Sequence, residues 1–227
     1  MPSLKFSGVV AMTSDYVYRG VSLRDEKPSA LAMGNVSYGL FYLSAAAVGI
    51  DLGRDSLDRP IGNVEFDLKT GITPSFGPLD LNLGVQAYTF PHGRDVEAGT
   101  LLRSERDFVE LFLRASTSFD TVTVGANVAW TQQFYQDGGQ VWTVESHAGL
   151  SLPTLGRLTG RLNGVLGIAR SAQANVVAPG HGYTYWNLGT ELRIDRLVLD
   201  FRYWGTDVTN VDGYESRFVA STALLLD

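Results

Sequence analysis

The stretch LDLNLGVQAYTF, residues 79–90, decides the fold, because it separates two kinds of side chain by strict alternation. Its odd positions carry leucine, valine and alanine, whereas its even positions begin with aspartate, asparagine, glycine and glutamine. A period of two is typical of a β-strand with one apolar and one polar face. The segment DFVELFLRASTSFD, residues 107–120, repeats the pattern, and a short turn leads to a third alternating run at residues 122–131.

The same alternation, punctuated by Gly, Pro, Asn and Asp, predicts about twelve strands and no helix along the chain. Alanine occurs on both faces of residues 31–50, so the inward and outward assignment there is left open. The expected strands are residues 6–18, 29–38, 41–50, 64–74, 79–90, 107–119, 122–131, 141–152, 158–168, 183–194, 197–204 and 217–225.

The connections between these strands alternate in length. Short reversals lie at residues 39–40, 75–78, 120–121, 153–157 and 195–196. Longer polar connections lie at residues 19–28, 51–63, 91–106, 132–140, 169–182 and 205–216. In an up-and-down barrel this order gathers all short turns at one rim and all long loops at the other, which a Greek-key sandwich is not expected to do.

The fold class that follows is all-β. We expect one domain, residues 1–227, that forms a single up-and-down antiparallel transmembrane β-barrel of about 12 strands. Short periplasmic turns and longer extracellular loops complete the predicted topology, with both chain ends on the periplasmic side.

Composition excludes several other classes of protein. The chain has no cysteine, and only His92, His147 and His181 offer imidazole, so neither a metal centre nor a cofactor is expected. A net charge of -6 without a basic block argues against nucleic-acid binding. No apolar run reaches the roughly 18 residues that a membrane-spanning helix needs. The mean hydropathy of +0.02 agrees with a membrane barrel, in which only alternate residues face lipid.

Aromatic residues favour lipid over a soluble core as the environment of the apolar faces. Tyr and Trp prefer the membrane interface, and here aromatic residues gather near the long-loop ends of the outward stripes. The expected girdle comprises Tyr16, Tyr18, Phe108, Trp130, Trp142, Trp186 and Tyr203. The expected partners are therefore outer-membrane lipid and small hydrophilic solutes or ions.

The polar faces would then enclose a lumen with charges of both signs, in which carboxylates pair with guanidinium groups. Asp15 and Arg19 are four residues apart and share a face, and either pore lining or ion pairing with neighbouring strands accounts for them. The side chains expected to line a pore are Asp15, Arg19, Glu65, Asp67, Lys69, Asp80, Gln86, Glu110, Arg114, Glu145, His147, Arg161, Glu191, Arg193, Asp200, Arg202 and Arg217.

The segment TSDYVYRGVS, residues 13–22, closely resembles the N-terminal signature of the TorF-like putative porins, the Gcw_chp domain family of proteobacterial outer membranes. In that family TSDYVFRG is followed by serine, an acidic turn and a Pro-containing second strand, which residues 24–30 match. The resemblance implies an outer-membrane β-barrel with a porin label that names no substrate. One departure is the final ALLLD, residues 223–227, which lacks the terminal aromatic residue usual in such barrels. No signal peptide is visible, so the sequence is interpreted as a mature exported form.

Three functions follow from this reading. The first is a porin-like channel for passive diffusion of ions or small polar solutes. The second is an outer-membrane enzyme of the lipase or protease type, which needs a nucleophile beside an oriented base. His147 shares a face with Glu145, but Ser146 points the other way, so we expect no catalytic residues and no enzyme. The third is a plugged barrel that serves as an anchor, for which the loop at residues 91–106 could fold inward. The sequence leaves the solute and the oligomeric state open.

Overall fold

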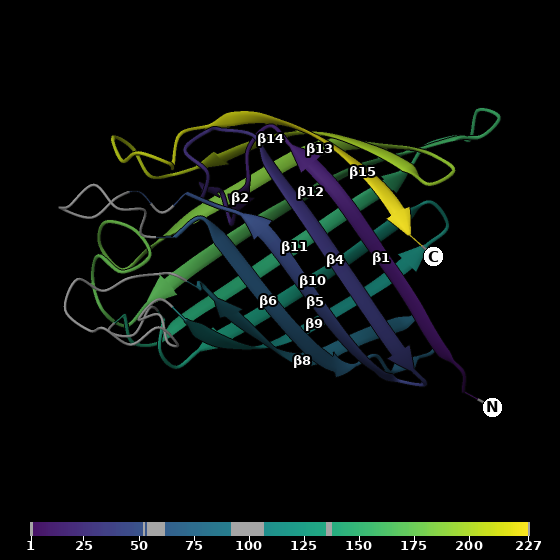
Figure 1. The fold of residues 1–227 in the computed structure, drawn as a ribbon, viewed down its shortest axis with the longest axis horizontal. Coiled ribbons are helices and arrows are strands. Elements are labelled where there is room, and N and C mark those ends of the chain that lie inside the picture. The colour runs from purple at the N-terminus through teal and green to yellow at the C-terminus, as the bar shows by residue number, and fades with distance from the viewer. Residues whose placement is uncertain (1, 52, 54–61, 92–106, 135–137, 227) are drawn as a thin grey trace.

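The wall of the molecule is a closed β-barrel. The computed structural model describes residues 2–226 except 52, 54–61, 92–106 and 135–137. Twelve long antiparallel strands form the barrel, and each pairs with the next along the chain (Figure 1). No helix in the described part of the chain is long and apolar enough to cross a membrane.

Closure comes from the pairing of the first strand with the last. Val9 of β1 lies opposite Leu225 of β15, so the meander has no free edge. A two-residue strand, β7 (Ser75–Phe76), extends the turn between β6 and β8. The wall strands are β1 (Leu4–Thr13), β4 (Ser29–Tyr38), β5 (Phe41–Gly49), β6 (Val64–Ile72), β8 (Leu79–Thr89), β9 (Phe108–Phe119), β10 (Val122–Thr131), β11 (Val141–Ser151), β12 (Leu158–Ser171), β13 (Gly182–Ile194), β14 (Leu197–Thr206) and β15 (Arg217–Leu226).

The predicted sorting of the connections is confirmed. Tight reversals follow β4, β6, β9, β11 and β13, and both chain ends lie at the same end of the barrel (Figure 1). Asp120 and Asp195 begin two of these turns with φ of 53° and 54°, a conformation that aspartate tolerates better than most residues. We call this rim the tight-turn end and the opposite rim the long-loop end.

The predicted faces of the strands are also right. On β9, Leu111 and Leu113 are 53% and 42% exposed, whereas Glu110 and Phe112, which alternate with them, are 3% and 7% exposed. For β4 and β5, whose faces the sequence left open, the Tyr42 hydroxyl donates to Asn82 Oδ1 of β8 at 2.9 Å across the interior. The outer surface is therefore apolar, as lipid contact requires, and the inner surface is polar.

We expect Leu113→Arg to destabilise the barrel by about 2 to 4 kcal/mol, because it places a charge against the hydrocarbon. Ser116→Arg on the same strand faces inward and serves as the matched control, for which little change is expected. Urea midpoints of the protein folded in lipid vesicles measure the difference. Equal midpoints for the two variants would contradict the assignment of the faces.

Candidate functional site

The segment between β1 and β4 turns away from the wall and folds into the barrel. The predicted first strand, residues 6–18, ends earlier, at Thr13, and the rest forms a small hairpin of β2 (Val17–Tyr18) and β3 (Val21–Ser22). Arg19 and Gly20 connect the two strands with φ of 52° and 84°. These positive values match a tight hairpin turn, in which glycine is favoured.

The tip of the hairpin fits closely against the barrel wall. A Cβ atom added at Gly20 would lie 2.8 Å from Thr206 Cγ2 and 2.9 Å from Tyr185 Cβ, so a larger residue would collide with β13 and β14. The Tyr183 hydroxyl of β13 also donates to the Arg19 carbonyl oxygen at 3.0 Å. Glycine is therefore required at this position both for its backbone conformation and for the close approach.

A bidentate ion pair anchors the hairpin to one wall. Arg19 Nη1 and Nη2 donate to Glu110 Oε1 and Oε2 of β9 at 2.7 and 2.9 Å. Both side chains are almost buried, with 10% and 5% exposure. Two tyrosines reach the neighbouring strands, since the Tyr16 hydroxyl donates to Glu65 Oε1 at 3.1 Å and the Tyr18 and Tyr88 hydroxyls lie 3.4 Å apart.

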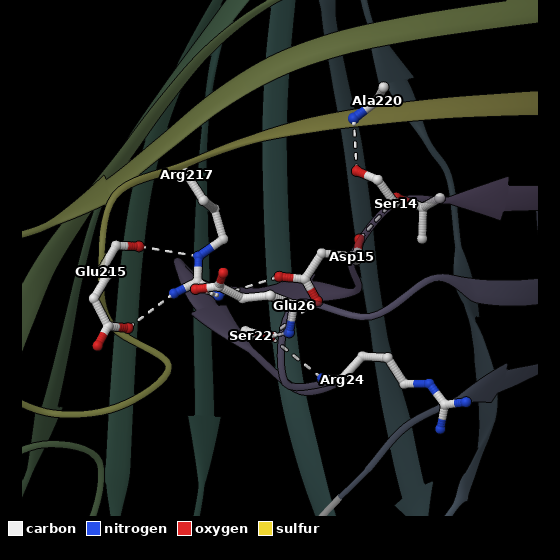
Figure 2. Close-up of polar contacts among 9 residues, drawn as sticks. Ser14, Asp15, Ser22, Arg24, Glu26, Glu215, Arg217 and Ala220 are labelled. Atoms are coloured by element: carbon white, nitrogen blue, oxygen red, sulfur yellow. Dashed lines mark hydrogen bonds and ion pairs between the residues drawn. The ribbon is translucent and has the colours of Figure 1, made fainter.

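A second buried ion pair anchors the base of the hairpin (Figure 2). Arg217 Nη1 of β15 lies 3.1 Å from Asp15 Oδ2, and the Ser22 hydroxyl donates to Asp15 Oδ1 at 2.9 Å. Arg217 also contacts Glu26 at 3.6 Å and Glu215 at 3.2 Å. In the sheet order β15 and β9 are six strands apart by either route, so the two ion pairs tie the hairpin to opposite walls.

Aromatic side chains fill the space around the hairpin at the long-loop end. Tyr88, Phe108 and Tyr185 are 6%, 5% and 0% exposed and belong to the buried core. Tyr16 and Tyr18 pack against this core. The prediction that Tyr16, Tyr18 and Phe108 join an outward aromatic girdle is therefore wrong. Trp142, Trp186 and Tyr203, by contrast, are 50%, 37% and 49% exposed on the outer face, as predicted.

The opposite half of the lumen is accessible. The inward-facing Asp80, Arg114 and Arg193 near the tight-turn end are exposed, whereas Glu65 and Glu110 beside the hairpin are buried. We call the part around the hairpin the closed half and the part towards the tight turns the open half. A cavity of about 240 Å³ lies below the hairpin, where residues 15–17 face the inner surfaces of β14, β15 and β1.

The predicted pore-lining residues all lie on the inner wall or on the hairpin. In the closed half these are Asp15, Arg19, Glu65, Glu110, Glu145 and Arg217. In the open half and at the boundary they are Asp67, Lys69, Asp80, Gln86, Arg114, His147, Arg161, Glu191, Arg193, Asp200 and Arg202. Their position agrees with the expected strand faces, and their role in conduction stays a prediction.

Several of these inward residues form networks between strands. Arg202 donates to Asn187 Oδ1 at 2.5 Å, to Asn163 Oδ1 at 2.6 Å and to both Asp200 carboxylate oxygens. Glu145 accepts from the Tyr185 hydroxyl at 2.7 Å. The contacts of Arg202 with Asn187 and Asn163 and that of Tyr185 with Glu145 cross from one strand to another, whereas Asp200 lies on the same strand as Arg202.

Sequence reasoning missed the inward hairpin and its aromatic surroundings. The Arg19-Gly20 pair is a turn signal, but period-two alternation predicts a strand that runs on to Tyr18. The loop at residues 91–106, which we considered as an inward plug, lies outside the described residues apart from Pro91. His147 and Glu145 do share the inner face, as predicted.

The fold and the polar inner wall define the chain as an outer-membrane β-barrel. It belongs to the family described as "Bacterial protein of unknown function (Gcw_chp)", whose model matches residues 2–224. This confirms the family that the N-terminal segment resembles. No match was found among curated proteins.

Several solved structures share the architecture at very low sequence identity. The NanC porin aligns with a TM-score of 0.57 at 8% identity, over 97% of this chain and 99% of that chain. The COG4313 outer membrane channel from Pseudomonas putida F1 gives 0.57 at 10% identity, over 97% and 94%. LpxR from Salmonella typhimurium gives 0.55 at 10% identity, over 97% and 99%. These likenesses establish the fold alone.

We expect Gly20→Ala to reduce the free energy that holds the hairpin against the wall by about 1 to 3 kcal/mol, the usual range for local backbone strain. Gly156→Ala is the matched control, because Gly156 also has a positive φ, of 63°, but nothing lies within 4 Å of its added Cβ. Limited trypsin digestion after Arg19 and Arg24, followed by mass spectrometry, reports exposure of the hairpin. Cleavage that is no faster in Gly20→Ala than in the control would contradict the close fit.

Proposed function

We propose that the protein is an outer-membrane channel for passive diffusion of ions or small polar solutes, and that the β2–β3 hairpin forms its constriction. The observation that carries the proposal is the contrast in exposure along the inner wall. Charged side chains such as Arg114 are accessible from the tight-turn end. Glu110 lies four residues from Arg114 on the same face of β9, but it is buried and paired with Arg19.

The cavity below the hairpin supports a constriction that water can approach. Its volume of about 240 Å³ exceeds by many times the roughly 10 to 15 Å³ that one water centre needs. Asp15, Asp200 and Arg202 supply polar groups on its lining. Solutes that enter the open half would therefore meet a partly hydrated path up to the hairpin.

Side-chain contacts, rather than extensive backbone pairing, hold the hairpin against the wall. Its strands pair with each other rather than with the wall. Side chains of the wall contact it, and the connection between β14 and β15 adds a backbone bond from Ser22 N–H to Gly213 C=O at 2.9 Å. An element attached in this way can shift without opening the barrel ladder. A narrow or intermittently conducting channel is the behaviour that this arrangement supports.

The two other functions have weaker support. His147 lies on the inner wall, and its ring occupies the space beside Gly125 rather than a position next to a serine nucleophile. The absence of enzymatic activity stays a prediction. A permanently plugged anchor is consistent with the filled long-loop end, and the same conductance experiment distinguishes it from a channel.

We expect Arg19→Gln combined with Glu110→Gln to increase the mean single-channel conductance or the open fraction several-fold relative to wild type in planar bilayers. The double change removes the ion pair without leaving one buried charge unpaired, a defect that would cost about 3 to 5 kcal/mol. The matched control is Arg157→Gln with Asp195→Asn, which removes an exposed ion pair at the tight turns. No change is expected in the control.

Two results would contradict the proposal. Absence of conductance steps from folded wild type and from the double variant would favour the plugged anchor. Equal conductance of wild type, double variant and control would mean that the hairpin is not the constriction. Different migration of boiled and unboiled samples on a gel verifies in each case that the barrel is folded.

A further inference from the structure

The charges on the inner wall are separated along the barrel. In the closed half, four carboxylates face two guanidinium groups: Asp15, Glu65, Glu110 and Glu145 against Arg19 and Arg217. In the open half, six cations face four carboxylates: Lys5, Lys69, Arg114, Arg161, Arg193 and Arg202 against Asp67, Asp80, Glu191 and Asp200. The accessible part of the lumen is thus net positive, although the whole chain carries -6.

The carboxylates of the closed half are all engaged. Asp15 and Glu110 form the two hairpin ion pairs with Arg217 and Arg19. Glu65 accepts from the Tyr16 hydroxyl, and Glu145 accepts from Tyr185 and Asn127. Since Glu65 and Glu110 are also only 2% and 3% exposed, their charges are turned away from the open half.

Among the described residues, five of the six cations of the open half have no carboxylate oxygen within 4.0 Å: Lys5, Lys69, Arg114, Arg161 and Arg193. Lys5 lies at the start of β1, and Arg193 donates to the Asp195 carbonyl oxygen at a tight turn, so Lys69, Arg114 and Arg161 are the three that lie further inside the lumen. Arg202, in contrast, is neutralised by Asp200 at 2.8 Å. An unpaired cation on a wall that lipid surrounds produces a stronger field than one in bulk water, because the low-dielectric wall focuses it.

Two of these cations flank one aromatic ring. Lys69 Nζ lies 4.6 Å and Arg114 Cζ lies 5.3 Å from the centroid of the Phe112 ring. The tip of the ring reaches Gly84 of β8, because a Cβ atom added there would come within 2.6 Å of Phe112 Cζ. Cation–π contact satisfies these cations without cancelling their charge, so both remain available to an anion.

The third cation, Arg161, lies on the β11–β12 part of the wall. Its Nε would lie 2.6 Å from a Cβ added at Gly149, so the guanidinium lies along the wall of β11. Its Nε has no hydrogen-bond partner, and Glu191, its neighbour in register on β13, does not come within 4.0 Å. Nε is buried against the wall, and the half-buried guanidinium keeps its charge without a carboxylate partner.

We propose that the open half of the lumen is an anion-selective vestibule, in which Lys69, Arg114 and Arg161 attract small anions such as chloride, phosphate or carboxylates. The inference rests on the proposed channel function and specifies the class of solute. Asp67, Asp80 and Glu191 are the unpaired carboxylates that oppose these cations. Asp67 lies on the same face of β6 as Lys69, and the Ser75 hydroxyl donates to Asp80. Rings of Lys and Arg are the usual device for anion preference in pores.

The experiment measures the reversal potential of wild-type channels in planar bilayers under a KCl gradient. The sign of the potential is expected to report chloride preference. Lys69→Gln, Arg114→Gln and Arg161→Gln together should lower the chloride-to-potassium permeability ratio at least about threefold. The matched control, Lys27→Gln, Arg157→Gln and Arg170→Gln, removes the same charge from outside the lumen and should leave the ratio unchanged.

The outcomes separate this inference from the proposed function. Conductance steps with cation preference, or a ratio that the lumen variant and the control change equally, would overturn the anion vestibule and leave the channel intact. A folded wild-type protein without any steps would overturn the channel and the vestibule together. If the triple variant does not fold, the three single variants are measured, and each should shift the ratio in the same direction.

Discussion

Closure of the hydrogen-bond ladder between β1 and β15 is the constraint on which the rest of this structure depends. In hydrocarbon no water is available to a backbone N–H or C=O group, so a sheet can cross a membrane only as a cylinder without edges. Once the cylinder is closed, every strand has one face towards lipid and one towards the lumen. Leucine and valine must then occupy the first face, and polar side chains are confined to the second.

The confinement of polar groups explains how a short hairpin can close one end of the barrel. Inside a twelve-strand wall the hairpin meets partners on opposite sides, and five strands lie between its two ion-paired anchors in either direction. Buried ion pairs add little net stability after desolvation, but removal of one partner is costly. The bidentate Arg19–Glu110 pair and the Asp15–Arg217 pair therefore fix where the hairpin lies more than they stabilise the barrel.

The same ion pairs divide the lumen electrically. At the long-loop end they pair carboxylates with arginines, in a region that the hairpin and its aromatic neighbours fill. The cations nearer the tight turns keep fewer acidic partners and stay accessible. A chain that is acidic as a whole can thus present a basic surface to a solute inside it, because the position of a charge decides its effect more than the total does.

The sequence by itself determined the number of strands, their faces, the sorting of loops and the family. These properties depend on period-two alternation, on turn residues and on a local motif, which are all readable over a few residues. It also placed Glu110, Arg114 and the other inward charges on the correct side, because successive residues of a strand point to opposite faces of the sheet.

Only the tertiary structure decided what residues 14–23 do. Continued alternation predicted a strand with Tyr16 and Tyr18 towards lipid, whereas they turn inward to Glu65 and Tyr88. The contacts that produce this join residues 91 and 202 positions apart, Arg19 with Glu110 and Asp15 with Arg217. No local pattern encodes such pairs, because they form only after the barrel has brought β9 and β15 to opposite sides of one lumen.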